Sequence, residues 1–212
     1  MLPGSGMTAE RNQDMEAKIL EAADNLFSER GFAMTSTTEI AKEAGCNQAL
    51  VHYYFRTKDR LFEAIFETKL KLFVKAFLKI GNEDLSFEEK LRRKIETHFD
   101  ILAKNPRLPF LVINELLTNP ERVKAIRSRI VPFALEAYEQ FDRELTAAIA
   151  RGEIRPITPL DLIMNVISMN VILFVASPVI REVMGLDDKA FAKLVAHRRA
   201  ETVETVLRSL KP

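Results

Sequence analysis

The chain has 212 residues, of which 47% are hydrophobic and 29% charged, so it can bury a sizeable core. Thirty-one basic against thirty acidic residues leave a net charge of +1, which neither requires nor excludes a nucleic-acid partner. The one cysteine, Cys46, excludes an internal disulfide, and with His52 and His98 it makes no metal-ligand spacing, so we expect no metal and no other cofactor.

The chain begins with a segment that does not fit a signal peptide, because residues 1–7 contain neither a charged n-region nor a long apolar h-region. We expect residues 1–12 to form a flexible leader, with Met7 as an alternative start. A first helix is predicted over about residues 13–30, and Gly31 is predicted to stop it. Its apolar face consists of Ile19, Ala22, Ala23, Leu26 and Phe27.

Two short helices should follow. Residues 36–39, Ser-Thr-Thr-Glu, form a capping box at the start of the second helix, and Gly45 ends it. Asn47 can cap a third helix that runs to Phe55. Two short helices joined by a tight turn that begins at glycine are typical of a helix-turn-helix. The residues that would hold this pair together are Ile40, Ala41, Ala44, Val51 and Phe55.

The third helix is predicted to present Gln48, Ala49, His52 and Tyr53 outward. Such a helix fits the major groove of DNA, where glutamine can make two hydrogen bonds to adenine and a small apolar group can contact a thymine methyl.

A long fourth helix should begin after Thr57, which can cap it, and end near Gly81. Its apolar stripe needs a partner surface and consists of Phe62, Phe66, Leu70, Phe73 and Phe77. We place the domain boundary inside this helix, with a DNA-binding domain at 13–60 and a helical ligand-binding and dimerisation domain at 61–212.

The rest of the chain is predicted to be helical. Helices are expected at about 86–105 (with a second capping box, Ser86 to Glu89), 110–118, 119–151 with a bend at Pro132, 159–177, and 188–210. Pro178 should kink or end the fourth of these. No convincing alternating strand is found, so the fold class is all-α with about nine helices.

The stretch from Leu162 to Ile180 contains no charged residue and is close to the length of a membrane span. Polar residues such as Asn165, Ser168 and Asn170 interrupt it, and no aromatic belt flanks it. We therefore expect a helix buried in a bundle or at a subunit interface, and no membrane association.

Two segments resemble the N-terminal signature of the tetracycline-repressor (TetR) family: residues 35–45, TSTTEIAKEAG, and residues 51–61, VHYYFRTKDRL. The resemblance covers about residues 15–65. It implies that Gln48, Ala49, His52 and Tyr53 face the bases and nearby backbone, and that Thr37, Thr38 and Lys58 reach phosphates. Ala49, Leu50 and His52 stand where glycine, threonine and tyrosine are common, and these departures should alter which operator is read.

The resemblance further implies a cytoplasmic, ligand-responsive transcriptional regulator, most often a repressor. It would bind a palindromic operator in double-stranded DNA as a homodimer and be released by a small-molecule inducer, which the composition predicts to be largely apolar. The candidate ligand-binding residues are Phe73, Phe77, His98, Ile101, Leu102, Phe110, Ile113, Leu117, Met164, Ser168 and Met169. The candidate dimer-interface residues are Ile167, Val171, Phe174, Phe191, Leu194, Val203, Val206, Leu207 and Leu210. The alternative for the last two helices is that they complete a monomeric core.

Two other classes of function remain as alternatives. One is a helical small-molecule-binding or protein-interaction module without a DNA role. The other is a small helical enzyme, which we do not expect because the sequence contains no phosphate loop, nucleophile elbow or metal-ligand pair.

Residues 1–58 hold six basic against eight acidic side chains, so DNA binding should depend less steeply on salt than in strongly basic repressors.

Overall fold

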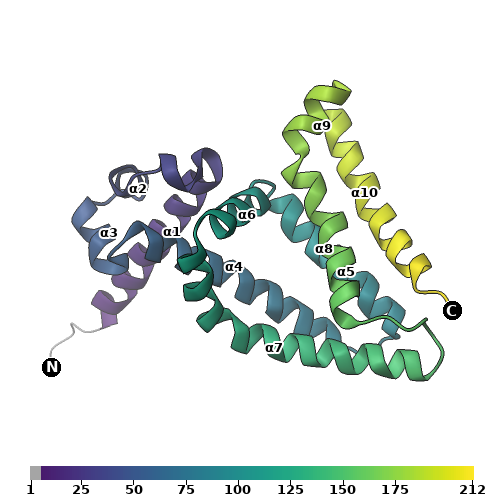
Figure 1. Ribbon diagram of the computed structural model, residues 1–212. Coiled ribbons are helices and arrows are strands. Elements are labelled where there is room, and N and C mark those ends of the chain that lie inside the picture. Colours follow the sequence, from purple (N-terminus) through teal and green to yellow (C-terminus); the bar gives the residue numbers. More distant parts are fainter. Residues whose placement is uncertain (1–5) are drawn as a thin grey trace. The chain divides into compact units, whose positions relative to one another are not determined.

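A computed structural model describes residues 6–212, with side chains from Asp14 onward except at positions 111, 115, 116, 122, 125, 126, 129, 130 and 133. The described residues form ten α-helices and no strand, so the prediction of an all-α fold is confirmed (Figure 1). The helices are α1 (Gly6–Met34), α2 (Thr37–Glu43), α3 (Gln48–Phe55), α4 (Lys58–Gly81), α5 (Phe87–Lys104), α6 (Leu108–Thr118), α7 (Pro120–Ala150), α8 (Pro159–Val175), α9 (Ser177–Met184) and α10 (Asp188–Ser209).

The structure has one helix more than the nine predicted, and this additional helix begins beside Pro178. The uncharged helix α8 ends at Val175, and a separate short helix, α9, begins at Ser177 at an angle of 59° to it. Pro178 lies in the first turn of α9, where the N–H that proline lacks would have no helical partner in any case. The proline therefore starts a new helix, whereas the sequence predicted that it would only kink or end the old one.

The start of α1 differs from the prediction, because the helix begins at Gly6 and includes most of the expected leader. Only residues 1–5 of that leader lie outside the described residues. The predicted break at Gly31 is confirmed, since this residue has a φ of 81° and a ψ of 164°, and a last helical turn follows it. The Thr35 hydroxyl donates to the Gly31 carbonyl at 2.9 Å and fixes that turn.

The chain divides into two compact units, and α4 contributes to both. In the first unit, α1, α2, α3 and the start of α4 share one hydrophobic core. The fully buried members of that core include Ile19, Phe27, Ile40, Val51 and Leu61. The structure therefore confirms the predicted apolar face of the first helix and the predicted packing of α2 on α3.

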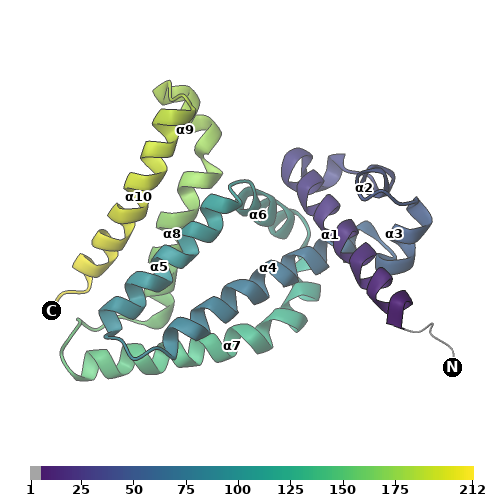
Figure 2. The same ribbon diagram turned by 180° about the vertical axis from the view of Figure 1, so that it is seen from behind.

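The second unit contains Leu70–Phe110 and Arg127–Pro212. Its helices α5, α8 and α10 lie side by side in both views and pack against one another (Figures 1 and 2). The bidentate ion pair from Arg199 of α10 to Asp100 of α5, at 2.7 and 2.9 Å, ties two of these helices together. This ion pair also lowers the pKa of Asp100.

The packing of α8 and α10 removes four of the nine predicted dimer-interface residues from the surface, and the interface itself stays a prediction. Four of its residues are buried inside the protomer, at 3% exposure or less: Phe174, Val203, Val206 and Leu210. Val171, Phe191, Leu194 and Leu207 are half-buried against the same cores. Periodicity identified the apolar positions, but it could not separate the face that packs on α5 from the face that points outward.

The second predicted capping box is only half correct. Ser86 accepts a hydrogen bond from the backbone N–H of Glu89, as expected. The Glu89 carboxylate, however, accepts from Nε of Arg93 at 3.0 Å, because the arginine lies one turn later on the same face of α5.

Candidate nucleic-acid interface and cavity

The helix pair α2–α3 begins at a complete capping box. The Ser36 hydroxyl accepts from the N–H of Glu39, and the Glu39 carboxylate accepts from the N–H of Ser36 at 2.9 Å. The Ser36 backbone N–H and hydroxyl, together with Arg30 at 3.0 Å, hold the pKa of Glu39 below its usual value. The start of α2 is thus fixed locally, and the ionised Glu39 carboxylate is paired with Arg30.

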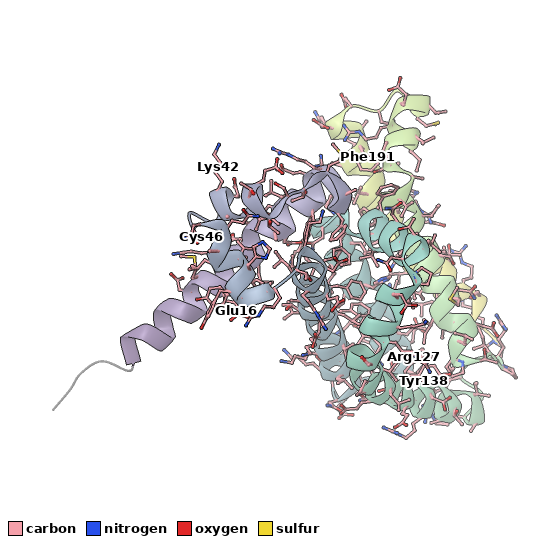
Figure 3. All side chains as sticks on the ribbon, turned by 60° about the vertical axis from the view of Figure 1, so that its left-hand side comes forward. Glu16, Lys42, Cys46, Arg127, Tyr138 and Phe191 are labelled. Atoms are coloured by element: carbon pink, nitrogen blue, oxygen red, sulfur yellow. The ribbon has the colours of Figure 1, made fainter. Side chains whose placement is uncertain are left out.

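The turn between α2 and α3 runs through Gly45, whose φ of 69° favours glycine, and Asn47 then caps α3 by accepting from the N–H of Leu50. Cys46 in this turn is a free cysteine, half-buried against the first core (Figure 3). Burial raises the pKa of the Cys46 thiol, which disfavours the reactive thiolate and supports a structural role over redox sensing.

With Val51 and Phe55 buried, the opposite face of α3 is open to solvent. All four residues predicted to face DNA lie on it and are exposed: Gln48, Ala49, His52 and Tyr53. Tyr53 is 64% exposed and contacts the ring of Tyr54 edge-on. Thr37 and Thr38 lie in the first turn of α2, where Thr38 is exposed and Thr37 is half-buried.

Two of these side chains are held in fixed orientations. The Gln48 amide donates to the Thr37 hydroxyl at 2.9 Å, which leaves its Oε1 and one N–H available. Nδ1 of His52 lies 3.0 Å from the carbonyl oxygen of Arg56. Since a carbonyl only accepts, Nδ1 must carry the hydrogen of this contact. The face is therefore partly preorganised.

The Lys58 side chain, which is predicted to reach a DNA phosphate, does not extend freely into solvent. Its ammonium donates to the carbonyls of Phe32 and Thr35, each at 2.9 Å, and lies 4.3 Å from the centre of the Phe32 ring. Lysine at the start of α4 thus caps the end of α1, a contact between residues far apart in sequence. Lys42, in contrast, is exposed and projects from α2 into solvent (Figure 3).

The second unit contains a cavity of about 430 Å³, within the range of small-molecule sites. Residues of α4, α5, α7 and α8 line it, and almost all of them are apolar. From the predicted ligand-binding set, Phe73, Phe77 and His98 line this cavity, and Ile167 from the predicted dimer set joins them.

The other predicted ligand-binding residues do not line this cavity. Leu102 is buried in the core, and Ile101 and Met169 are half-buried. The remaining five are exposed: Phe110, Ile113, Leu117, Met164 and Ser168. The sequence offered no way to tell which turn of each helix would face the cavity.

The contribution of α7 was missed altogether. This helix lines the cavity with Val131, Ala134, Leu135, Ala137, Tyr138 and Phe141. Their spacing of three and four residues is an amphipathic pattern and could have revealed this face. Figure 3 labels Tyr138 on this helix.

Two of the three polar side chains at the cavity wall, Lys94 and His98, contact polar groups outside the lining, and the third is Tyr138. Lys94 is 4% exposed, and its ammonium lies 2.6 Å from the Glu144 carboxylate and over the ring of Phe141. His98 packs edge-on against Phe73, and its Nδ1 lies 3.1 Å from the amide nitrogen of Asn170. Burial lowers the pKa of His98 to about 4, so its imidazole is neutral at pH 7.

Two short helices packed on a shared core, the second with an exposed outer face, on a chain that also contains an apolar cavity between helices, are typical of the class of helix-turn-helix regulators with a helical C-terminal body.

The chain belongs to the tetR family of bacterial regulatory proteins. Residues 19–65 match the model described as "Bacterial regulatory proteins, tetR family", and residues 88–206 match "Tetracyclin repressor-like, C-terminal domain". The resemblance seen in the sequence is thereby confirmed. Its relatives are named transcriptional regulators rather than enzymes, as the sequence predicted.

Two curated relatives come from Bacillus subtilis (strain 168). The fatty acid metabolism regulator protein is 27% identical over 65% of this chain and 70% of its own length. The HTH-type transcriptional regulator YfiR is 28% identical over 73% of this chain and 75% of its own length. Both are therefore similar well beyond the helix-turn-helix.

Among solved structures, FadR from Bacillus subtilis in complex with stearoyl-CoA has a TM-score of 0.69 and 22% identity, covering 92% of this chain and 98% of that one. PfmR from Thermus thermophilus has a TM-score of 0.68 and 22% identity, covering 92% and 99%. At this identity the likeness shows the shared fold.

Within residues 6–212, no single helix is long and apolar enough to cross a membrane, although α8 and α9 taken together pass by length and composition despite their bend. Among the residues whose side chains are described, no group of three or more histidine, cysteine, aspartate or glutamate side chains could hold a metal ion.

Proposed function

We propose that this protein is a cytoplasmic repressor that binds a palindromic operator as a homodimer and leaves it when a small, largely apolar ligand occupies the cavity of the second unit. The observation that carries the proposal is the outward face of α3, Gln48 to Tyr53, supported from beneath by the buried Val51 and Phe55. A helix so exposed can enter the major groove with its side chains directed at base edges.

The hydrogen bond that fixes the orientation of the Gln48 side chain favours recognition of a base. Ordering a flexible side chain at an interface costs about 0.5–1.5 kcal/mol, and the Thr37 hydroxyl bears part of that cost before DNA arrives. Thr37 would thus assist Gln48 in addition to reaching a phosphate.

A dimer is expected because a two-turn recognition helix reads only a few base pairs, and a second copy supplies the other half-site. We propose an interface on the apolar side chains that α8 and α9 leave exposed, in place of the predicted seam. These side chains are Leu160, Met164, Ile172, Val179, Val183 and Met184. An exposed apolar surface of this kind marks an interaction site.

For the ligand, an acyl chain is the leading candidate. The cavity is lined almost entirely by apolar side chains, and the similar FadR was solved with stearoyl-CoA. Ligand binding would act by population shift: helix α4, which carries residues of both units, would favour a state whose recognition helices no longer match the half-site spacing.

The test is selection of palindromic DNA by the purified protein, followed by titration of the selected site. Gln48→Ala and Tyr53→Ala should each weaken specific binding at least tenfold, whereas Lys79→Ala, an exposed change near the end of α4, should not. Dodecanoyl-CoA should then release the protein from the site. Equal affinity of all variants for DNA, or ligand binding that leaves operator affinity unchanged, contradicts the proposal.

A further inference from the structure

The cavity wall contains one hydrogen-bond donor whose direction is set by a buried amide. Asn170 is fully buried on α8, and its amide nitrogen lies 3.2 Å from the Ile95 carbonyl and 3.1 Å from Nδ1 of His98. The bond to the carbonyl requires that the NH₂ group points this way, because a carbonyl oxygen cannot donate. The orientation of the Asn170 amide is therefore fixed by the backbone of α5.

The second N–H of that amide then faces Nδ1 of His98, which must accept it. In a neutral imidazole, one nitrogen accepts and the other carries the hydrogen, so the hydrogen lies on Nε2. The pKa of His98, lowered to about 4 by burial, is consistent with this neutral ring. Within the part of the chain whose side chains are described, no acceptor is found for Nε2, and the residue lines the cavity.

Besides His98, the lining has two polar side chains, Lys94 and Tyr138; Tyr138 is 40% exposed, whereas His98 is held in place by Asn170. Lys94 is bound to Glu144 at 2.6 Å, and a second lysine, Lys90, lies 3.9 Å from the same carboxylate. Because Glu144 already balances the charge of Lys94, a ligand carboxylate beside this pair would lie next to a second negative charge, which is unfavourable. Asp100 and Glu96, which flank His98 in sequence, pair with Arg199.

We infer that the cavity selects an apolar ligand that carries one uncharged hydrogen-bond acceptor, such as an ester or thioester carbonyl, and that Nε2–H of His98 donates to it. Asn170 acts as a positioning residue that fixes the tautomer of His98. This inference rests on the proposed ligand-responsive function and adds which chemistry the ligand must carry.

The first test measures the tautomer in the protein without ligand. Long-range ¹⁵N–¹H spectra of histidine-labelled protein distinguish the two neutral forms, and His52→Gln and His197→Gln variants assign the signals of the three histidines. His98 should be neutral with its hydrogen on Nε2 at pH 7. A hydrogen on Nδ1 overturns the inference, and this result does not depend on any variant of His98 folding.

The second test compares apolar ligands with and without an acceptor. Methyl dodecanoate, tetradecane, dodecanoate and dodecanoyl-CoA are delivered from one cyclodextrin carrier, and occupancy is read by native mass spectrometry. His98→Phe should weaken methyl dodecanoate about threefold to tenfold, the value of one hydrogen bond, and change tetradecane less than twofold. His98→Gln, which keeps a donor, should retain most of the ester affinity.

The control Phe77→Ala removes apolar lining and should weaken the ester and the alkane by the same factor. Comparison of dodecanoyl-CoA with methyl dodecanoate shows whether the cavity also binds a thioester that is attached to a large headgroup. Equal losses for ester and alkane in His98→Phe, or tighter binding of dodecanoate than of its methyl ester, would overturn the inference while leaving the proposed function intact. If none of the four compounds binds, the proposed function fails and the inference fails with it.

Discussion

Single residues carry roles that their positions in the sequence did not reveal, and Lys58 is an example. The motif predicts a phosphate contact, yet the ammonium donates to two carbonyls at the end of α1. Hydrogen bonds from a charged group contribute more to stability than neutral ones. The primary role of Lys58 is therefore to hold α1 and α4 together within the helix-turn-helix unit.

Lys58→Met should lower the free energy of unfolding by about 2 kcal/mol, because two carbonyls lose a charged donor. Denaturant titration followed by circular dichroism measures this. The salt slope of DNA binding should stay unchanged, whereas loss of a phosphate contact would reduce it by about 0.9 per subunit. The exposed Lys42→Met is the control, with an expected stability change within about 0.5 kcal/mol.

His98 should make stability depend on pH in a defined window. Its pKa is lowered from 6.5 to about 4 by burial, so between these values the unfolded chain binds a proton that the folded protein does not. The contribution of the neutral His98 to the free energy of unfolding is fully present above pH 6.5. It declines by about 3 kcal/mol in total as the pH falls toward 4.

Comparison of the wild type with His98→Gln isolates this effect, because carboxylates such as Asp100 titrate in both proteins. The stability difference between the two proteins should shift in favour of the variant as the pH falls from 7 to 4. Parallel stability curves for the two proteins over this range would show that His98 titrates normally in the folded state.

At the scale of elements, the boundaries that were predicted well are those set by local chemistry. Ser36, Asn47 and Thr158 each accept a backbone N–H at a helix start, and these bonds involve residues only three positions apart. The boundaries that were missed are the start of α1 at Gly6 and the separate helix that begins beside Pro178.

Gly31 is the element boundary most sensitive to substitution. Its φ of 81° and ψ of 164° lie in a region that is essentially restricted to glycine, although a Cβ there would meet no neighbour. Gly31→Ala should therefore cost about 1–3 kcal/mol from backbone strain alone. Thermal and denaturant unfolding measure the cost.

Gly45→Asn serves as the comparison, because asparagine tolerates a φ near 69° and the loss should stay below about 1 kcal/mol. If Gly31→Ala were as stable as the wild type, the backbone at the end of α1 would differ from the one described.

At the scale of the whole molecule, the proposed dimer depends on the outward face of α8. Ile172 is 58% exposed there, whereas Phe174, two residues later, is buried. Ile172→Glu should convert the dimer to a monomer, since a charge would have to be desolvated in an apolar interface. Sedimentation velocity measures the change, and operator affinity should fall with it. The exposed Thr146→Glu on α7 adds the same charge elsewhere and should leave the dimer intact.

The sequence by itself determined the helical class, the helix-turn-helix and its outward residues, because periodicity, caps and turn glycines act over a few residues. The family signature extended this to a regulator of DNA. The tertiary structure decided which turns of α4, α5, α7 and α8 enclose the cavity, and it decided that Val206 and Leu210 are core residues. It also decided that Lys58 caps another helix. Those outcomes depend on which faces of distant helices meet, and an amphipathic pattern predicts that a face is buried without specifying its partner.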